Sequence, residues 1–353
     1  PPPSRIFHGR QDVLGQMHGY FNQKLEKQHI FLLHGLGGAG KTQIALKFIE
    51  ESSWATSFSN IFLIDTSTRD TIETGLKNIA VTKAGSSSQD ALRWLVSKLD
   101  DWLLFFDNAD DPKINLNSFF PKCAHGNILI TSRNPGLCVY AGSHALISDM
   151  EEPDAVHLLL TSAAQDFTAG NKDMAVEIVK ELSCLPLAII QAGAFIAESG
   201  ALNSYLALFK QNQARLLSKK PAQSHDDYGG TVYTTWQISF AQLSEPAATL
   251  LQLCSFLHHQ GISEKIFSYA SAYQFQANGL SEEELRKPME LLSLFLSPTG
   301  AWDSLRFMEV RNELRAYSLI NFDMESGFFS IHPLVHSWSR STLADEKRYH
   351  ESM

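Results

Sequence analysis

The stretch Gly35-Leu36-Gly37-Gly38-Ala39-Gly40-Lys41-Thr42 fits the pattern G-x-x-x-x-G-K-[ST] of a phosphate-binding P-loop. The apolar residues 30–33 before it predict a buried strand, and residues 43–51 after it predict a helix. Glycines let consecutive backbone N–H groups converge on one phosphate, and the N-terminus of the helix adds partial positive charge. This strand, loop and helix therefore predict a nucleotide site. The plain alternative is a glycine-rich turn.

Two segments supply the predicted phosphate and metal chemistry. Lys41 is expected to reach the β- and γ-phosphates, while the Thr42 hydroxyl ligates Mg²⁺. The apolar run Trp102–Asp107 predicts a buried strand that ends in a carboxylate, which is a Walker B pattern. Asp107 is then expected to hold the same ion, often through water. The alternative is a strand followed by an ordinary acidic loop at 108–112.

Residues 127–133 predict another strand, which ends in polar residues and Arg133. At a strand tip beside Asp107, the Arg133 guanidinium could pair bidentately with a γ-phosphate. A surface arginine explains the residue equally well, and the residues alone leave both interpretations open.

Strands alternate with helices up to about residue 150, which predicts a doubly wound parallel α/β P-loop domain for residues 1–150. Further strands are expected at 57–65 and 144–147, and helices at 13–28, 71–81 and 89–99.

Residues 151–225 predict a small helical domain with helices at 154–164, 173–182, 187–198 and 204–216, and a polar linker at 219–227. Residues 226–353 predict helices at 232–242, 246–257, 282–294 and 309–317. A hairpin of 319–324 and 328–331 follows them, then a helix after His332, which together indicate a winged-helix domain.

Composition excludes several classes of protein. The net charge of −9 argues against a nucleic-acid-binding surface, while 44% hydrophobic and 19% charged residues are ordinary for a globular protein. The four cysteines lie far apart without a C-x-x-C pair, which predicts reduced thiols in a cytoplasmic protein, with neither a disulfide framework nor a zinc site. No apolar run is long enough to span a membrane. Because Pro1-Pro2-Pro3 is not a natural start, we expect a piece of a longer protein.

The order of motifs is similar to that of the NB-ARC region of nucleotide-binding immune and cell-death receptors (NLR proteins), a branch of the STAND ATPases, over nearly the whole chain. Residues 35–42 resemble Walker A, residues 103–107 resemble Walker B, and residues 128–133 resemble the sensor strand. The sequence LPLA at 185–188 resembles the G-L-P-L-A motif, with Cys184 in place of the glycine. The sequences IHP at 331–333 and HGR at 8–10 resemble the M-H-D and x-G-R motifs. The local sequences, such as DNAD at 107–110 and HPLVH at 332–336, are most similar to those of fungal members of the family.

The resemblance implies that ADP or ATP binds with Mg²⁺ and operates a switch. It implies that Arg133 reads the γ-phosphate, that Pro186 packs over the nucleotide, and that His332 contacts the β-phosphate of ADP. The x-G-R segment is expected to touch the base. The resulting cofactor-binding set is His8, Gly9, Arg10, Gly37, Gly38, Ala39, Gly40, Lys41, Thr42, Gln43, Arg133, Pro186 and His332. Lys41, Asp107 and Arg133 are the expected catalytic residues, and Thr42 and Asp107 the expected Mg²⁺ ligands.

Partners also follow from the resemblance. The ADP form is expected to be a closed monomer and the ATP form an oligomer of the same chain. An effector domain is expected before this region and a repeat sensor domain after it.

Two positions depart from the family pattern. The second acidic residue of Walker B, which acts as the base for the attacking water, is Asn108 here, and an amide accepts no proton near neutral pH. At most slow ATP hydrolysis is therefore expected, unless Asp110 or Asp111 substitutes. Pro333 stands where the M-H-D motif has its aspartate, so the contribution of that aspartate to holding the chain closed is in doubt.

Three alternatives stay open. A winged-helix transcription regulator would bind DNA, but residues 226–353 carry nine Lys and Arg against sixteen Asp and Glu, a balance of −7. An ordinary turnover P-loop ATPase or kinase would need a base and a substrate pocket, and neither stands out. His332 and His336 have the i, i+4 spacing of zinc ligands, but Pro333 stands where H-E-x-x-H has glutamate, and no third ligand is obvious.

Overall fold

The computed structural model describes residues 1–23, 27–54, 58–83, 85–99, 101–218, 231–272, 290 and 292–351. It divides into two compact units, Pro1–Val232 and Tyr233–Met353. The predicted linker at 219–227 and most of the predicted helix at 282–294 lie outside the described residues.

The first unit is built on a parallel sheet of five strands in the order β2-β3-β4-β1-β5. The strand that precedes the P-loop, β1, and the strand that ends in Asp107, β3, flank β4. Their carboxyl ends, with that of β4, thus meet at one edge of the sheet. The bounds are β1 His29–His34, β2 Asn60–Asp65, β3 Trp102–Asp107, β4 Asn127–Ser132 and β5 Ser143–Leu146.

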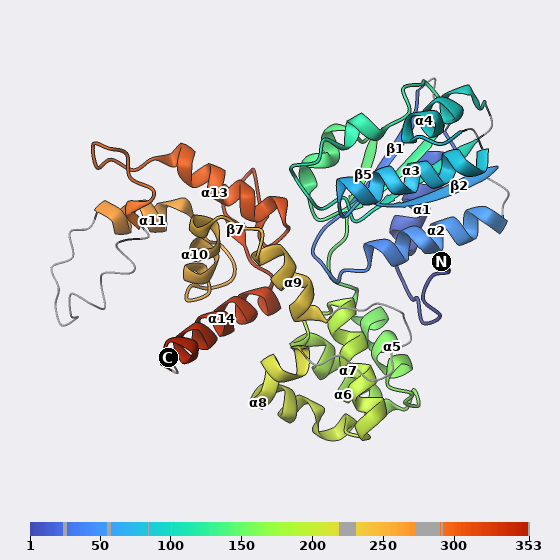
Figure 1. Ribbon diagram of the computed structural model, residues 1–353. Helices are drawn as coiled ribbons and strands as arrows, with labels where there is room; N and C mark the ends of the chain where they lie inside the picture. The colour runs from blue at the N-terminus through green and yellow to red at the C-terminus, as the bar shows by residue number, and fades with distance from the viewer. Residues whose placement is uncertain are drawn as a thin grey trace, which may run out of the picture. The chain divides into compact units, whose positions relative to one another are not determined.

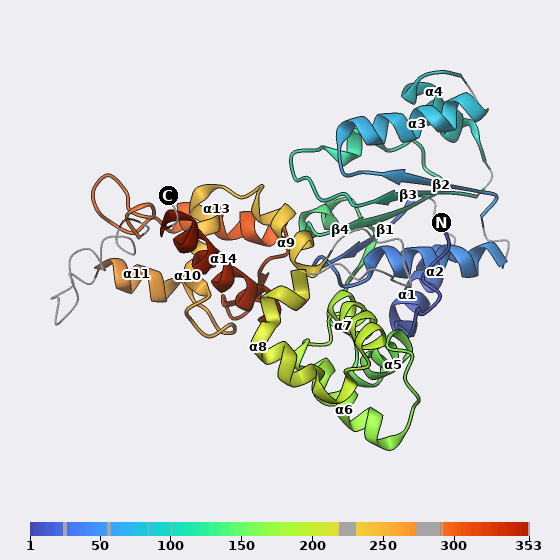
Figure 2. The ribbon, with the colours of Figure 1, turned by 60° about the horizontal axis from the view of Figure 1, so that its bottom comes forward.

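Helices cover both faces of the sheet, as the apolar strands require. Successive residues of β1 point to opposite faces: Phe31 and Leu33 pack with α1 and α2, whereas Leu32 packs with α3 and α4. Figures 1 and 2 show these two helix pairs on opposite sides of the sheet. The bounds are α1 Gln11–Phe21, α2 Lys41–Trp54, α3 Arg69–Lys83 and α4 Ser88–Ser97. The predicted doubly wound α/β fold is confirmed.

Four helices follow β5 in the same unit, at the positions that the apolar periodicity predicts. They are α5 Glu152–Ser162, α6 Ala169–Glu181, α7 Pro186–Ser199 and α8 Tyr205–Ser218. Prolines occupy the first turns of α5 and α7, where a missing N–H costs nothing. The separate domains predicted for 1–150 and 151–225 stay a prediction, because both segments lie in one compact unit.

Cys184, which stands where the G-L-P-L-A motif has its glycine, has a glycine-like backbone conformation. Cys184 has φ +51°, in the left-handed backbone region that residues other than glycine seldom adopt. Its carbonyl accepts a hydrogen bond from Met150 N–H at 3.0 Å, which ties the α6–α7 turn to the segment after β5.

The second unit contains helices and one short hairpin. The elements are α9 Val232–Phe240, α10 Glu245–Cys254, α11 Glu264–Ala272, α13 Ser304–Ala316, β6 Asn321–Phe322, β7 Phe329–Ser330 and α14 Pro333–Glu351. The predicted hairpin is confirmed, although its ladder is short and Phe329 also bridges to Ile262. The α11 helix was not predicted from the sequence.

None of the helices among the described residues is sufficiently long and apolar to cross a membrane.

Candidate functional site

A cavity of about 240 Å³ opens where β1, β3 and β4 end, between the P-loop and the start of α7. It collects most of the residues that the sequence predicts for nucleotide binding. Those that line it are His8, Arg10, Gly37, Gly38, Ala39, Gly40, Lys41, Thr42, Gln43, Asp107, Arg133 and Pro186. Gly9 does not line the cavity, and His332 lies in the second unit.

The P-loop has the backbone conformation that its glycines permit. Gly38 and Gly40 both have φ +91°, which a side chain would strain. Gly38 also lies under α7: its carbonyl accepts a hydrogen bond from Leu187 N–H at 3.1 Å, and a Cβ on Gly38 would approach the Leu187 Cβ to 3.1 Å. The loop is therefore joined directly to the helix that Pro186 begins.

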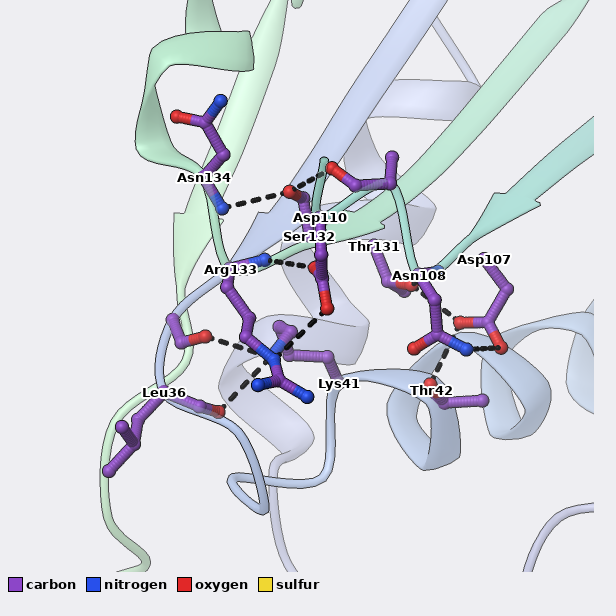
Figure 3. Close-up of polar contacts among 12 residues, drawn as sticks. Leu36, Lys41, Thr42, Asp107, Asn108, Asp110, Thr131, Ser132, Arg133 and Asn134 are labelled. Carbon is purple, nitrogen blue, oxygen red and sulfur yellow. Dashed lines mark hydrogen bonds and ion pairs between the residues drawn. The ribbon is translucent and has the colours of Figure 1, made fainter. Parts of the chain in front are cut away.

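Lys41 lies buried inside this loop. Its Nζ donates to the carbonyl oxygens of Gly35 at 2.8 Å and Leu36 at 3.1 Å (Figure 3). Burial lowers the pKa of Lys41 to about 8, although the nearby carboxylates of Asp110 and Asp107 favour the charged form. A phosphate oxygen would offer this poorly solvated ammonium an acceptor with a full negative charge.

Asp107 is held by hydroxyl groups from the two neighbouring segments. Its Oδ1 accepts hydrogen bonds from Thr42 Oγ1 at 2.8 Å and Thr131 Oγ1 at 2.5 Å (Figure 3). Burial raises the pKa of Asp107, and these two hydrogen bonds oppose the shift. The carboxylate and the Thr42 hydroxyl are thus adjacent hard oxygen donors of the kind that Mg²⁺ prefers.

Arg133 and Asp110 form an ion pair at the cavity wall. The Arg133 Nε lies 3.0 Å from Asp110 Oδ2, and the Arg133 backbone N–H donates to Asp110 Oδ1 at 2.7 Å (Figure 3). Only 14% of the Arg133 side chain is exposed, which excludes the interpretation of a surface arginine. Asp110 lines the cavity as well, so a carboxylate lies where a terminal phosphate would compete for the guanidinium.

Asn108 occupies a left-handed conformation, φ +62°, which asparagine tolerates better than most residues. Its backbone N–H donates to Thr131 Oγ1 at 3.0 Å, and its side-chain Nδ2 lies 3.4 Å from Asp107 Oδ2. Asn108 therefore borders the cavity next to the predicted metal ligand.

The HGR segment, near the N-terminus of the chain, borders the cavity and is held by several polar contacts. Arg10 donates to the carbonyl oxygens of Ser148 at 2.5 Å and Asp149 at 3.2 Å, and to that of Ala39 in the P-loop at 3.5 Å. His8 pairs with Asp154 at 3.3 Å. Gly9 has φ +74°, and a Cβ there would collide with the same Asp154 carboxylate, which explains the glycine.

Two parts of the site were missed from the sequence. Thr131 was seen only as part of a strand, because a threonine near a strand end carries no signal of its partner. An apolar patch of Met150, Leu158, Leu187 and Ile190 also lines the cavity. These side chains come from the β5–α5 segment, α5 and α7, and they offer a surface for an aromatic base.

In the second unit, His332 lies just before α14. Its Nδ1 accepts a hydrogen bond from Leu334 N–H at 3.2 Å, so the neutral ring carries its proton on Nε2. His336 bonds through Nε2 to the Leu257 carbonyl at 2.9 Å.

Comparisons with known proteins place the chain among P-loop NTPase-like folds. A "nucleotide-binding leucine-rich repeat (NLR)-like protein" of Hyaloscypha variabilis is 28% identical over 284 residues, which cover 69% of this chain. The chain spans 29% of that relative's length. Residues 238–348 match a domain of unknown function (DUF7779).

Among solved structures, the ORC2 protein of Aeropyrum pernix, in ADPNP and ADP complexes, aligns with a TM-score of 0.50 at 13% identity, over 97% of this chain and 96% of that one. A STAND protein of Pyrococcus horikoshii with a tetratricopeptide repeat sensor aligns with a TM-score of 0.38 at 14% identity. The alignment covers 97% of this chain and 43% of that one. The Hyaloscypha relative confirms the resemblance to NLR-like proteins that the motif order indicates.

Proposed function

We propose that this chain is the nucleotide-operated switch region of an NLR-like protein, and that its cavity binds ADP and ATP with Mg²⁺. The observation that carries the proposal is the convergence on one cavity of Lys41, Thr42, Asp107 and Arg133, which come from the P-loop and two other strand ends. Each supplies a group that phosphoryl chemistry uses: an ammonium, a hydroxyl, a carboxylate and a guanidinium.

The phosphates are proposed to lie in the P-loop, with the base against the apolar patch. Lys41 would exchange its loop carbonyls for the β- and γ-phosphate oxygens. Thr42 and Asp107 would hold Mg²⁺, which supplies positive charge to the phosphate oxygens. Pro186 would cover the nucleotide, because it lines the cavity at the start of α7.

Two contacts are proposed to distinguish ADP from ATP. A γ-phosphate would compete with Asp110 for Arg133, and only ATP can do so. His332 would donate from Nε2 to the β-phosphate of ADP and so favour the closed state. This role comes from the resemblance to the M-H-D motif, and the tautomer fixed by Leu334 N–H supports it. A ligand shifts a conformational equilibrium only through such differential contacts.

Activation is proposed to follow from ATP binding, with self-association of the open form. An effector domain and a repeat sensor in the longer protein would transmit and receive the signal, in immunity or programmed cell death. Hydrolysis would be slow, because Asn108 stands where relatives carry the base. The domain boundaries of the closed state would follow the predicted 1–150, 151–225 and 226–353.

Isothermal titration of the purified chain with Mg·ADP and Mg·ATP tests nucleotide binding. Lys41→Ala should weaken both affinities by about tenfold to a hundredfold, the worth of one charge-assisted hydrogen bond. Lys47→Ala is the matched control, since Lys47 lies on the same helix and pairs with Glu50 at 2.7 Å, outside the cavity. Equal affinities for the two variants would sink the proposed site.

A further inference from the structure

Three potential metal ligands meet on the other face of the sheet, away from Asp107 and Thr42. His34 ends β1, His144 lies in β5, and Cys138 lies in a 3₁₀ turn, η2 Pro135–Val139. The imidazole nitrogens and the Cys138 Sγ all lie within 4.8 Å of one another. His34 Nε2 and His144 Nδ1 are 3.4 Å apart.

The separation of the two nitrogens matches a tetrahedral zinc site. Two imidazole nitrogens at about 2.05 Å from zinc and at the tetrahedral angle lie about 3.4 Å from each other. The same construction with a Zn–S bond of about 2.3 Å places sulfur about 3.6 Å from each nitrogen. Because the sulfur is already within 4.8 Å of both rings, a small side-chain adjustment would close the set.

The backbone holds the two histidines in place. In the ladder between β1 and β5, Leu32 is paired with His144, and His34 is two residues further along β1. Side chains two residues apart on a strand share a face, so both rings project from the same side of adjacent parallel strands. Ligands on paired strands keep their spacing better than ligands on loops.

Burial also suits a metal site. The His34 side chain is buried, with 8% of the residue exposed, and Cys138 is half-buried against the core under this face. His144 is exposed, which gives an ion a route from solvent. A buried ligand, a shielded thiol and an exposed ligand together allow entry while limiting competition from water.

We propose that His34, Cys138 and His144 bind Zn²⁺, with a water or an exogenous ligand in the fourth position. Two imidazoles and a thiolate are the borderline and soft donors that zinc selects over Mg²⁺ and Ca²⁺. The spacing of 34, 138 and 144 follows no zinc motif, so the sequence predicts no zinc site among the cysteines. The ligands are brought together only by the sheet.

The position of the site links it to the nucleotide loop. His34 directly precedes Gly35, and its carbonyl accepts a hydrogen bond from Ile147 N–H at 2.7 Å. The ion would therefore cross-link β1, β5 and η2 one residue before the P-loop begins. Its binding does not depend on the proposed nucleotide switch.

Cobalt is the probe, because a Co²⁺–thiolate bond gives a near-ultraviolet charge-transfer band that oxygen and nitrogen ligands do not. The whole chain, stripped with a chelator and kept reduced, is titrated with Co²⁺ and then with Zn²⁺. We expect an intense band, tetrahedral visible absorption, and displacement of both by Zn²⁺. Absence of the band at about 1 mM Co²⁺ would overturn the proposal.

Variants assign the ligands. Cys138→Ser should abolish the band, and His144→Asn should weaken binding by at least about a hundredfold, since loss of a supporting group alone costs ten- to a hundredfold. Cys123→Ser is the matched control, a half-buried free thiol outside the cluster, and should keep full binding. Because His144 is exposed, its variant should fold even if Cys138→Ser does not.

Thiol protection provides a second readout. Zn²⁺ should slow the alkylation of Cys138 and leave that of Cys123 unchanged, because alkylating agents react with a free thiolate. Equal rates with and without Zn²⁺ would show that the two histidines form only a hydrogen-bonded pair. A charge-transfer band that survives in Cys138→Ser would show that another thiolate binds the metal, and either result would overturn the proposal.

Discussion

The Arg133 guanidinium lies 3.0 Å from the Asp110 carboxylate, and the Arg133 backbone N–H binds the other oxygen of that carboxylate at 2.7 Å. Both side chains line the cavity beside Lys41. The arginine that would read a γ-phosphate is therefore already held by an internal anion. In the proposed switch, the γ-phosphate of ATP would compete with this ion pair, whereas ADP would leave it in place.

Replacing Asp110 should favour ATP. In Asp110→Asn the competing charge is lost, and its repulsion of the phosphates is lost with it. We expect ATP affinity to rise by about three- to tenfold relative to ADP affinity, in line with a partly buried charged hydrogen bond. Titration calorimetry with both nucleotides measures the ratio. Asp111→Asn is the control, because Asp111 accepts from Lys113 N–H in the adjacent turn. A lower ATP-to-ADP ratio in Asp110→Asn would mean that Asp110 positions Arg133 for the nucleotide instead.

Thr131 should matter through the metal. Thr131→Val keeps the shape of the side chain but removes the hydrogen bond to Asp107, which further disfavours the carboxylate anion. Affinity for Mg·ADP should fall roughly tenfold, while affinity for ADP in EDTA changes little. Ser132→Ala is the control, since the Ser132 hydroxyl donates to the Ala109 carbonyl and does not contact Asp107. An equal loss with and without Mg²⁺ would contradict the assignment of Asp107 as a metal ligand.

Nucleotide affinity should decline in alkaline solution. Burial lowers the pKa of Lys41 to about 8, whereas bound phosphate would raise it again. At a pH below this pKa, Lys41 is protonated both in the free chain and in the nucleotide complex. Above it, binding must take up a proton, so affinity should fall by up to about tenfold per pH unit. Calorimetry between about pH 7 and pH 9.5 would show the slope. The slope should disappear in Lys41→Met, and a slope that persists there belongs to another group.

Hydrolysis should respond to residue 108. We expect the chain to turn over ATP more slowly than about once per second. Asn108→Asp restores a carboxylate in a left-handed conformation that aspartate tolerates, and it should raise turnover at least about tenfold. Phosphate release at saturating Mg·ATP measures both rates. Lys47→Ala serves as the control, because Lys47 pairs with Glu50 outside the cavity. Fast turnover by the unaltered chain would show that Asp110 or Asp111 acts as the base.

The sequence predicts the sheet well because its signals are local. Continuous apolar strands, the glycine pattern and a terminal carboxylate locate β1, the P-loop and Asp107 without knowledge of their neighbours. Thr131, Asp110 and the apolar patch were not assigned their roles, because each role depends on a partner in another segment. The His34, Cys138 and His144 cluster is the extreme case, since strand pairing alone brings the three residues together.

Identifying the nucleotide that copurifies with the chain tests the central claim most directly. The purified protein is denatured, its small molecules are separated by chromatography, and its mass is measured before denaturation. The proposed switch predicts close to one ADP per chain in a monomer, and a Lys41→Ala variant without it. A chain that carries no nucleotide, and that binds no ADP at about 1 mM after purification, would contradict the account.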